Sequence, residues 1–154
     1  MTKHSGNLFH PLLHAAHLVE ARLRDRLREL DLHPRQARVL SALERIGEAH
    51  QKTLVAEFDI TPASMSAMCD RLAAAGWIER QVDPNEKRAL LIRLTSEGER
   101  KAKEVRLAWN DIDAVIVDSL GHEVAHSMTD LAGKLRDQLG GRIPSFAKKG
   151  RDDG

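Results

Sequence analysis

The chain has 154 residues, 31% of them charged and 42% hydrophobic, with a formal net charge of +1 at pH 7. This length fits one domain with a core of its own, and the near-neutral charge excludes a polybasic protein that coats nucleic acid. Aromatic residues make up only 3%, with no tyrosine, which disfavours binding of RNA or single strands by stacking.

A single cysteine cannot form an internal disulfide. No apolar run approaches the roughly 20 residues that span a bilayer, and the polar start at residues 1–6 does not resemble a signal peptide. We therefore expect a cytoplasmic protein.

Residues 7–30 predict a long amphipathic helix, since apolar residues recur every three or four positions. These positions are Leu8, Leu12, Ala16, Val19, Leu23, Leu27 and Leu30. We interpret the charge on its other faces as a solvated surface with intrahelical ion pairs rather than a binding site. Pro34 begins a second helix, which Gly47 ends. Its predicted inward positions are Ala37, Val39, Leu40, Leu43 and Ile46.

Residues 48–53 read as a connection to a short apolar helix at 54–60, which breaks at Asp59. Thr61 as N-cap and Pro62 as first helical residue open another helix, and Gly76 is the expected left-handed stop. One side of this helix carries Met65, Met68, Cys69 and Leu72, and the other carries Ala63, Ser64, Ser66 and Ala67. Small side chains on an outward face allow close approach to another surface.

A β-hairpin is predicted next, because apolar residues alternate at 77–82 and 90–94 around the polar turn 83–88. Two helices joined by a sharp turn and followed by a hairpin with a basic tip form a winged helix-turn-helix. In such a unit one helix enters the DNA major groove.

Thr95 or Ser96 caps a further long helix, which Gly121 separates from a last helix ending near Leu139. The inward stripes are Ala102, Val105, Trp109, Ile112, Ile116 and Leu120, then Val124, Met128, Leu131, Leu135 and Leu139. The winged helix-turn-helix, called the reading head below, is too small to cover the apolar stripes of the first helix and the last two helices. A two-fold homodimer covers them and sets two reading helices roughly 34 Å apart, which suits a pseudo-palindromic operator.

Five segments in order, 59–66, 70–72, 76–78, 83–88 and 94–98, resemble the signature run of the MarR family of bacterial transcription regulators. The resemblance extends more loosely from Leu8 to Leu139. It implies a mainly α fold with a small β-hairpin wing, a winged helix-turn-helix flanked by long dimerisation helices. The chain departs from the family pattern at Ala67, where a long polar residue is frequent, and at Glu86-Lys87, where Asp-Arg is usual.

We expect one domain over residues 1–154 with three parts. Residues 33–97 form the DNA-binding core, 7–32 and 98–141 the helical dimerisation region, and 142–154 a flexible tail. The predicted partners are double-stranded DNA, a second copy of the chain and a small-molecule effector, with no membrane and no cofactor.

The predicted DNA contacts lie on the second helix of the motif and on the wing. They are Ala63, Ser64, Ser66, Ala67, Arg71, Lys87 and Arg88. Hydroxyls reach base edges or phosphates, and alanine packs on thymine methyls. Arg71 is the weaker candidate, since it could pair with Asp70 instead. The family match makes Arg88 the minor-groove arginine, oriented by Glu86 or Asp83. The alternatives are merely exposed small residues and a solvated turn.

The segment His122-Glu123-Val124-Ala125-His126 matches the zinc-hydrolase pattern H-E-x-x-H. No His or Glu follows His126 to supply a third ligand. We therefore treat the match as chance and predict no metal site and no enzyme, with a zinc hydrolase as the remote alternative.

A metal- or redox-responsive regulator of the same fold is the nearer alternative. His10, His14 and His17 share a helical face and could bind metal or sense pH, although a packed or solvated face is the simpler reading. Cys69 could sense oxidant, although its inward place favours a core role.

MarR-like proteins commonly bind aromatic acids or related compounds between the dimer helices and the reading head. The resemblance therefore implies an effector site here, with four candidate contacts. They are His14, His17, Arg38 and Trp109, although Trp109 could instead be a core residue. The expected function is that of a repressor that an effector releases from DNA.

Overall fold

Residues 7–143, which a computed structural model describes, form six helices and a three-stranded sheet. In chain order they are α1 (Phe9–Arg28), α2 (Pro34–Ile46), β1 (Glu48–His50), α3 (Gln51–Phe58), α4 (Pro62–Ala74), β2 (Ile78–Val82), β3 (Leu90–Leu94), α5 (Ser96–Leu120) and α6 (His122–Gln138). The predicted mainly α fold with a small β wing is confirmed. No helix in this range is both long and apolar enough to cross a bilayer.

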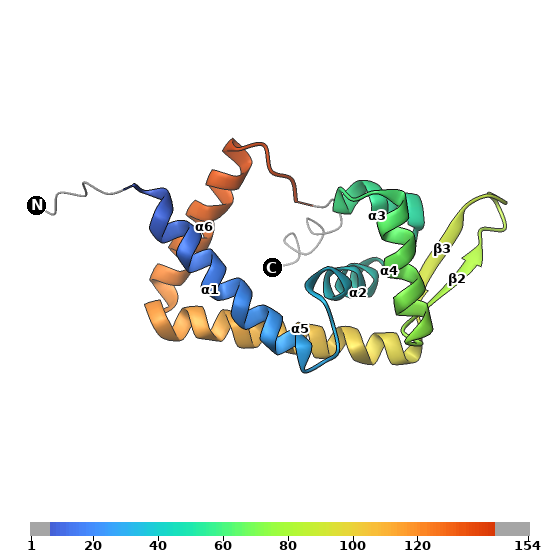
Figure 1. Ribbon diagram of the computed structural model, residues 1–154, viewed down its shortest axis with the longest axis horizontal. Coiled ribbons are helices and arrows are strands. Elements are labelled where there is room, and N and C mark those ends of the chain that lie inside the picture. Colours follow the sequence, from blue (N-terminus) through green and yellow to red (C-terminus); the bar gives the residue numbers. More distant parts are fainter. Residues whose placement is uncertain (1–6, 144–154) are drawn as a thin grey trace, which may run out of the picture.

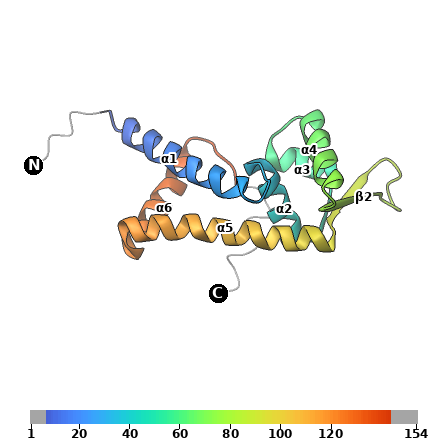
Figure 2. The same ribbon diagram turned by 60° about the horizontal axis from the view of Figure 1, so that its bottom comes forward.

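Helix α5 runs along the length of the molecule (Figure 1). Helices α2, α3 and α4 and the sheet form a reading head at one of its ends, and α1 and α6 gather at the other (Figures 1 and 2). Arg26 of α1 donates to Asp111 of α5 over 2.8 Å and to Glu29 over 2.7 Å. Helix α5 is therefore the shared support of both ends.

The hydrophobic core lies under the reading head. Its fully buried side chains include Leu27, Leu40, Leu43, Leu54, Met65, Leu72, Ile92 and Val105. They come from five helices and the sheet, so the head is held by contacts distant in sequence. Burying one leucine stabilises a fold by about 1.5–3 kcal/mol, and this cluster therefore accounts for much of the stability of the head.

The sheet has the antiparallel order β1-β3-β2. Its register pairs His50 with Leu91 and Val82 with Leu90. The prediction of a plain connection at residues 48–53 is wrong, because Glu48–His50 pairs with β3 and α3 already begins at Gln51. Three residues are too few to show strand alternation, and their extended form depends on the neighbouring strand.

The predicted starts of α2 and α4 are confirmed in atomic detail. Thr61 Oγ1 accepts from the Ser64 amide over 3.1 Å. His33 and Gln36 form a reciprocal capping box at the start of α2, which satisfies amides that lack a partner within the helix. Gly76 has φ +79° and ends α4 as expected.

The turn from β3 into α5 is locked by Thr95. Its hydroxyl donates to the Gly76 carbonyl over 2.6 Å and accepts from the Gly98 amide over 3.0 Å. A Cβ atom on Gly98 would lie 1.8 Å from the Trp77 carbonyl oxygen. Only glycine permits this close approach, which joins α5 to the end of α4.

Two predicted boundaries shift. Helix α1 covers Phe9–Arg28 rather than residues 7–30, and α6 ends at Gln138. On α5 the buried stripe is Ala102, Val105 and Ala108, whereas Leu120, predicted to face inward, is exposed. Of the predicted tail at 142–154, residues 144–154 lie outside the described residues.

Candidate nucleic-acid interface

Helix α4 has a buried side and an exposed side, as its sequence pattern predicted. Met65, Cys69 and Leu72 are fully buried. Ala63, Ser64 and Ala67 are exposed and Ser66 is half-buried. The helix is thus fixed to the core and presents small side chains outward.

Ser64 is already engaged in capping, but it keeps a free proton. The Thr61 hydroxyl donates to Ser64 Oγ over 2.9 Å. Since a serine hydroxyl both donates and accepts, Ser64 can still donate its own proton away from the helix. A hydroxyl oriented in this way suits a phosphate oxygen or a base acceptor.

The alternative pairing of Arg71 with Asp70 is wrong. Asp70 forms its ion pair with Arg80 of β2 instead, because Asp70 faces the strand that follows α4. Arg71 is exposed and has no ion pair with any residue in the range 7–143. Its guanidinium is therefore available to another molecule.

Arg71 lines a groove between α4 and the start of α2. The groove is lined by His33, Arg35, Gln36, Ser64, Ala67, Met68 and Arg71, with no carboxylate among them. Arg35 is exposed and, within the described part of the chain, its guanidinium makes no ion pair. Arg35 was not among the predicted contacts, because nothing in the sequence relates position 35 to position 71 before the chain folds.

The wing loop, residues 83–89, connects β2 to β3 and is closed by its own backbone. The Asp83 amide donates to the Ala89 carbonyl over 2.9 Å, and the Ala89 amide donates to Glu86 over 2.8 Å. Lys87 and Arg88 lie in its turn and are exposed. Neither forms an ion pair with a described residue.

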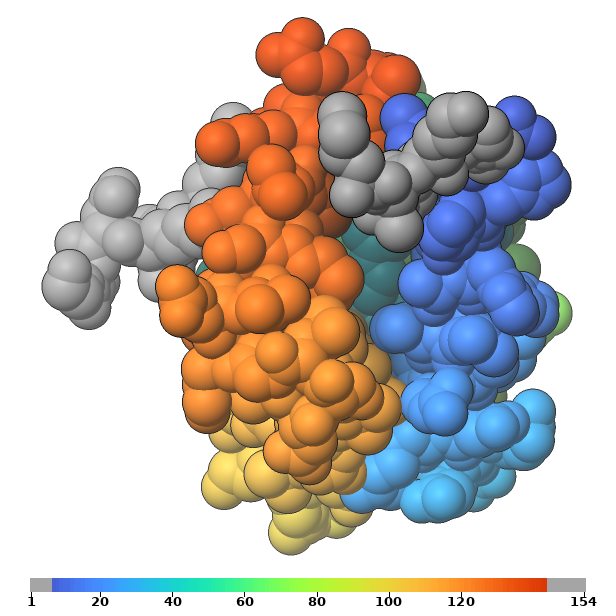
Figure 3. Space-filling model, turned by 90° about the vertical axis from the view of Figure 1, so that its left-hand side faces the viewer, coloured from blue at the N-terminus to red at the C-terminus, as the bar shows by residue number. Residues whose placement is uncertain are grey.

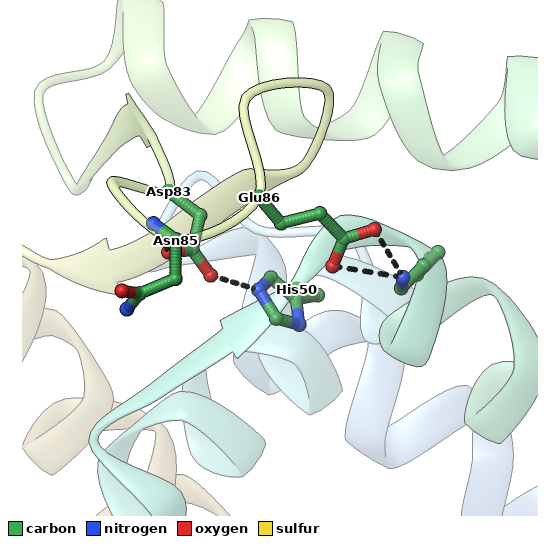
Figure 4. A network of polar contacts seen from close by, with 5 residues as sticks. His50, Asp83, Asn85 and Glu86 are labelled. Carbon is green, nitrogen blue, oxygen red and sulfur yellow. Dashed lines mark hydrogen bonds and ion pairs between the residues drawn. The ribbon is translucent and has the colours of Figure 1, made fainter.

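The prediction that Glu86 or Asp83 orients Arg88 is wrong. Asp83 accepts from His50 Nε2 over 2.7 Å, and both oxygens of Glu86 accept from Lys52 at 2.9 and 3.2 Å (Figure 4). Both acids therefore face the start of α3. His50 and Lys52 gave no sequence signal for this role, because their partners lie 33 and 34 positions further along the chain.

Asp83 is held as the ionised form. The Asn85 amide donates to its Oδ1 over 2.8 Å. This hydrogen bond, followed by that from His50, lowers the pKa of the Asp83 carboxyl. The charged carboxylate is therefore the form that fits the loop.

Cys69 is a core residue, which confirms its predicted inward place. Its side chain is fully buried. Burial raises the pKa of the Cys69 thiol to about 11, so at neutral pH it stays protonated and reacts slowly with oxidants.

The four proposed effector contacts lie on three helices, α1, α2 and α5. His14 and His17 are exposed on α1, Arg38 lies over the Phe58 ring at 5.6 Å, and Trp109 packs partly against the core. Among residues 7–143 no hydrogen bond, ion pair or ring contact joins any two of the four. Their shared role stays a prediction.

The histidines of the H-E-x-x-H match stand at the start of α6. The His122 and His126 rings lie nearly parallel with centroids 6.4 Å apart. Within the described range, no group of three or more His, Cys, Asp or Glu side chains is placed to hold a metal ion. The geometry adds no third ligand to the two histidines.

Comparison with known proteins agrees with this arrangement. The model of the MarR family matches residues 30–89. Over 103 residues the chain is 30% identical to the multiple antibiotic resistance protein MarR of Escherichia coli, covering 62% of this chain and 72% of that protein. The HTH-type transcriptional repressor MdtR of Bacillus subtilis is 26% identical over 102 residues, 66% of each chain.

Solved structures are also similar. A mutant E. coli MarR complexed with operator DNA has a TM-score of 0.70 and 25% identity, covering 84% of this chain and 99% of that one. These similarities, together with the winged helix-turn-helix geometry, establish that the chain belongs to the MarR family of transcription regulators.

Proposed function

We propose that the protein is a repressor that binds a pseudo-palindromic operator as a homodimer and is released by a small-molecule effector. One observation carries the proposal. The exposed face of α4 and the exposed Arg88 of the wing belong to one head, in a chain similar to a MarR protein solved with operator DNA.

Helix α4 would read the major groove. Ser64 and Ser66 supply hydroxyls, while Ala63 and Ala67 are small enough for contact with thymine methyl groups. The groove beside α4 holds two arginines without a competing carboxylate. Arg35 and Arg71 would therefore bind the phosphates that flank the bases contacted by α4.

The wing would enter the neighbouring minor groove. Arg88 and Lys87 are exposed at its turn, and Arg88 has no ion pair with any of residues 7–143 that would have to break first. Narrow A·T-rich minor grooves concentrate negative potential and attract an arginine. The wing thus favours A·T-rich positions outside those read by α4.

The dimer would form through the helices at the far end from the reading head. Apolar side chains there face solvent, among them Leu12, Leu18, Val115, Leu120, Val124, Met128, Leu131 and Leu135. Helices α1 and α6 make up most of the end of the molecule that Figure 3 shows. A monomer rarely leaves so much apolar surface exposed, and a second copy is its simplest cover.

Residues 33–97 would accordingly read DNA, and residues 7–32 and 98–141 would dimerise. An effector bound between the two regions shifts the equilibrium if it binds better to a dimer with the wrong head spacing. His14, His17, Arg38 and Trp109 are the residues we propose for its site. They lie on α1, α2 and α5, and so belong to both regions.

The test is a selection from a pool of random duplexes, followed by fluorescence anisotropy on the selected sequence. We expect a sequence with two inverted half-sites, bound at least about 1,000-fold more tightly than a shuffled duplex. Equal binding of both duplexes, with the same salt dependence, would refute a sequence-specific regulator.

A further inference from the structure

The wing loop is attached by two side-chain contacts to the segment where β1 becomes α3. One joins His50 Nε2 to Asp83 Oδ2 at 2.7 Å. The other joins Lys52 Nζ to the two carboxylate oxygens of Glu86 at 2.9 and 3.2 Å (Figure 4). We call this pair of contacts the wing anchor.

Asp83 is the centre of the anchor. It is the one charged residue buried within residues 7–143, with 8% of its surface exposed. A buried carboxylate needs hydrogen bonds to remain ionised. Asp83 has them at both oxygens, from the Asn85 amide at 2.8 Å and from His50. The Asp83 contact of the anchor is thus a satisfied buried site, and the Lys52–Glu86 contact lies beside it at the surface.

The sheet alone does not place the loop. Ladder pairing between β2 and β3 ends at Val82 and Leu90, and both of these side chains are exposed at the outer end of the hairpin. Beyond them, the loop's own backbone bonds fix its shape but not its direction. The contacts with His50 and Lys52 supply the missing link to the reading head.

The wing anchor also determines the ion-pair partners of Asp83 and Glu86. Glu86 lies two positions before Arg88 in the chain, and a free carboxylate there would compete with DNA for the guanidinium. Lys52 occupies both Glu86 oxygens, and His50 occupies one oxygen of Asp83. Arg88 lines the hollow beside this anchor with His50 and Lys52, yet it forms no ion pair with a residue of the described chain.

We propose that His50 and Lys52 are positioning residues that fix the wing relative to α4 and leave Arg88 free for the minor groove. The inference rests on the proposed DNA binding. It assigns to His50 and Lys52 a role in minor-groove recognition that acts through the position of the wing.

A double-mutant cycle on the selected operator tests this. Lys52→Met and His50→Ala should each weaken binding about 5- to 10-fold, and neither should weaken it further when Arg88→Ala is already present. The expected footprint loses minor-groove protection beside the wing and keeps protection in the major groove under α4. Lys52→Arg and His50→Gln, which retain a donor, should restore most of the affinity.

A second readout needs no DNA. Hydrogen exchange at the Ala89 amide, which closes the loop on Glu86, should speed up in Lys52→Met. Lys103→Met serves as the matched control, since Lys103 is exposed and forms no ion pair with any residue between 7 and 143. Lys52 is itself mostly exposed, so its variant folds even if His50→Ala does not.

The outcomes separate the two proposals. If the wild type binds selectively but losses from Lys52→Met and Arg88→Ala multiply, the anchor does not act through Arg88 and the inference is wrong. Unchanged Ala89 exchange in Lys52→Met overturns it as well. If the wild type shows no sequence preference at all, the proposed function fails and the inference falls with it.

Discussion

The reading head and the terminal helices differ in how far their apolar side chains are buried, and α5 belongs to both regions. In its first half Ala102, Val105 and Ala108 are fully buried against the head. Towards its end Val115 and Leu120 are exposed, with 40% and 42% of their surface accessible. The head has a core within one chain, whereas the terminal helices leave large apolar side chains exposed.

This difference separates two kinds of stability. Contacts inside the head are present at any protein concentration. The apolar stripes of α1 and α6 gain their stabilisation only when another surface covers them, so this end should depend on concentration. Substitutions in the head should therefore lower stability at every protein concentration, whereas substitutions in the terminal helices should change how stability depends on concentration.

The largest effect on stability is expected at the joint between the head and α5. Gly98→Ala places a Cβ against the Trp77 carbonyl and should cost about 3 kcal/mol in the free energy of unfolding, measured by urea denaturation. Gly133→Ala is the control, because a Cβ atom there would lie 3.8 Å from the tip of the flexible Arg136 side chain. Equal stability of the two variants would show that the joint tolerates a side chain.

The next effect concerns assembly. Leu131→Glu puts a charge on the exposed stripe of α6, where Leu131 is 63% accessible. It should convert the dimer to monomers in sedimentation, reduce operator affinity by about 100-fold or more through lost avidity, and leave the head folded. Lys134→Glu introduces the same acidic side chain on the same helix at a position that is already charged. It is the control and should remain dimeric. If Leu131→Glu also remains dimeric, the exposed stripe of α6 is not the interface.

Phosphate contacts come third. Arg35→Ala and Arg71→Ala should each lower operator affinity and reduce the slope of log affinity against log salt by about 1. Arg24→Ala, on an exposed part of α1, should change neither quantity. An unaltered slope for Arg35→Ala would remove α2 from the interface.

The smallest effect is the response of the wing to acid. Hydrogen bonds from Asn85 and His50 lower the pKa of Asp83, so the folded value lies below the unfolded value of about 3.9. Ionised Asp83 therefore stabilises the folded loop above about pH 4, and this contribution is lost as pH falls through the folded pKa. The protection of the Asn85 amide, measured as its exchange rate relative to the intrinsic rate at the same pH, should fall only in that acidic range.

Asp83→Asn should produce the fast Asn85 exchange already at pH 7, whereas the exposed Asp113→Asn should not. Fast exchange at neutral pH in the wild type would contradict the assigned carboxylate contacts.

The sequence predicted what depends on local spacing. Thr61, Pro62 and Gly76 marked the ends of α4, and its period of three to four separated Met65 and Leu72 from the outward residues. It failed where distant residues meet. Strand β1 exists because β3 lies beside it, and Arg35 and Arg71 line one groove only in the folded chain.

The wing shows the same limit more sharply. The nearest acids in sequence were natural partners for Arg88, but a neighbour in the chain is not a neighbour in space. Folding brings His50 and Lys52 to those acids from more than 30 positions away. The sequence therefore identified the charged residues of the wing loop but not the partners of their side chains.

The most direct test of the whole account is native mass spectrometry of the wild-type protein mixed with the selected duplex and with a shuffled duplex of the same composition. We predict two protomers on the selected duplex and no stable complex on the shuffled one. A single protomer per duplex would contradict the shared core of the terminal helices, and equal occupancy of both duplexes would contradict specific reading by α4 and the wing.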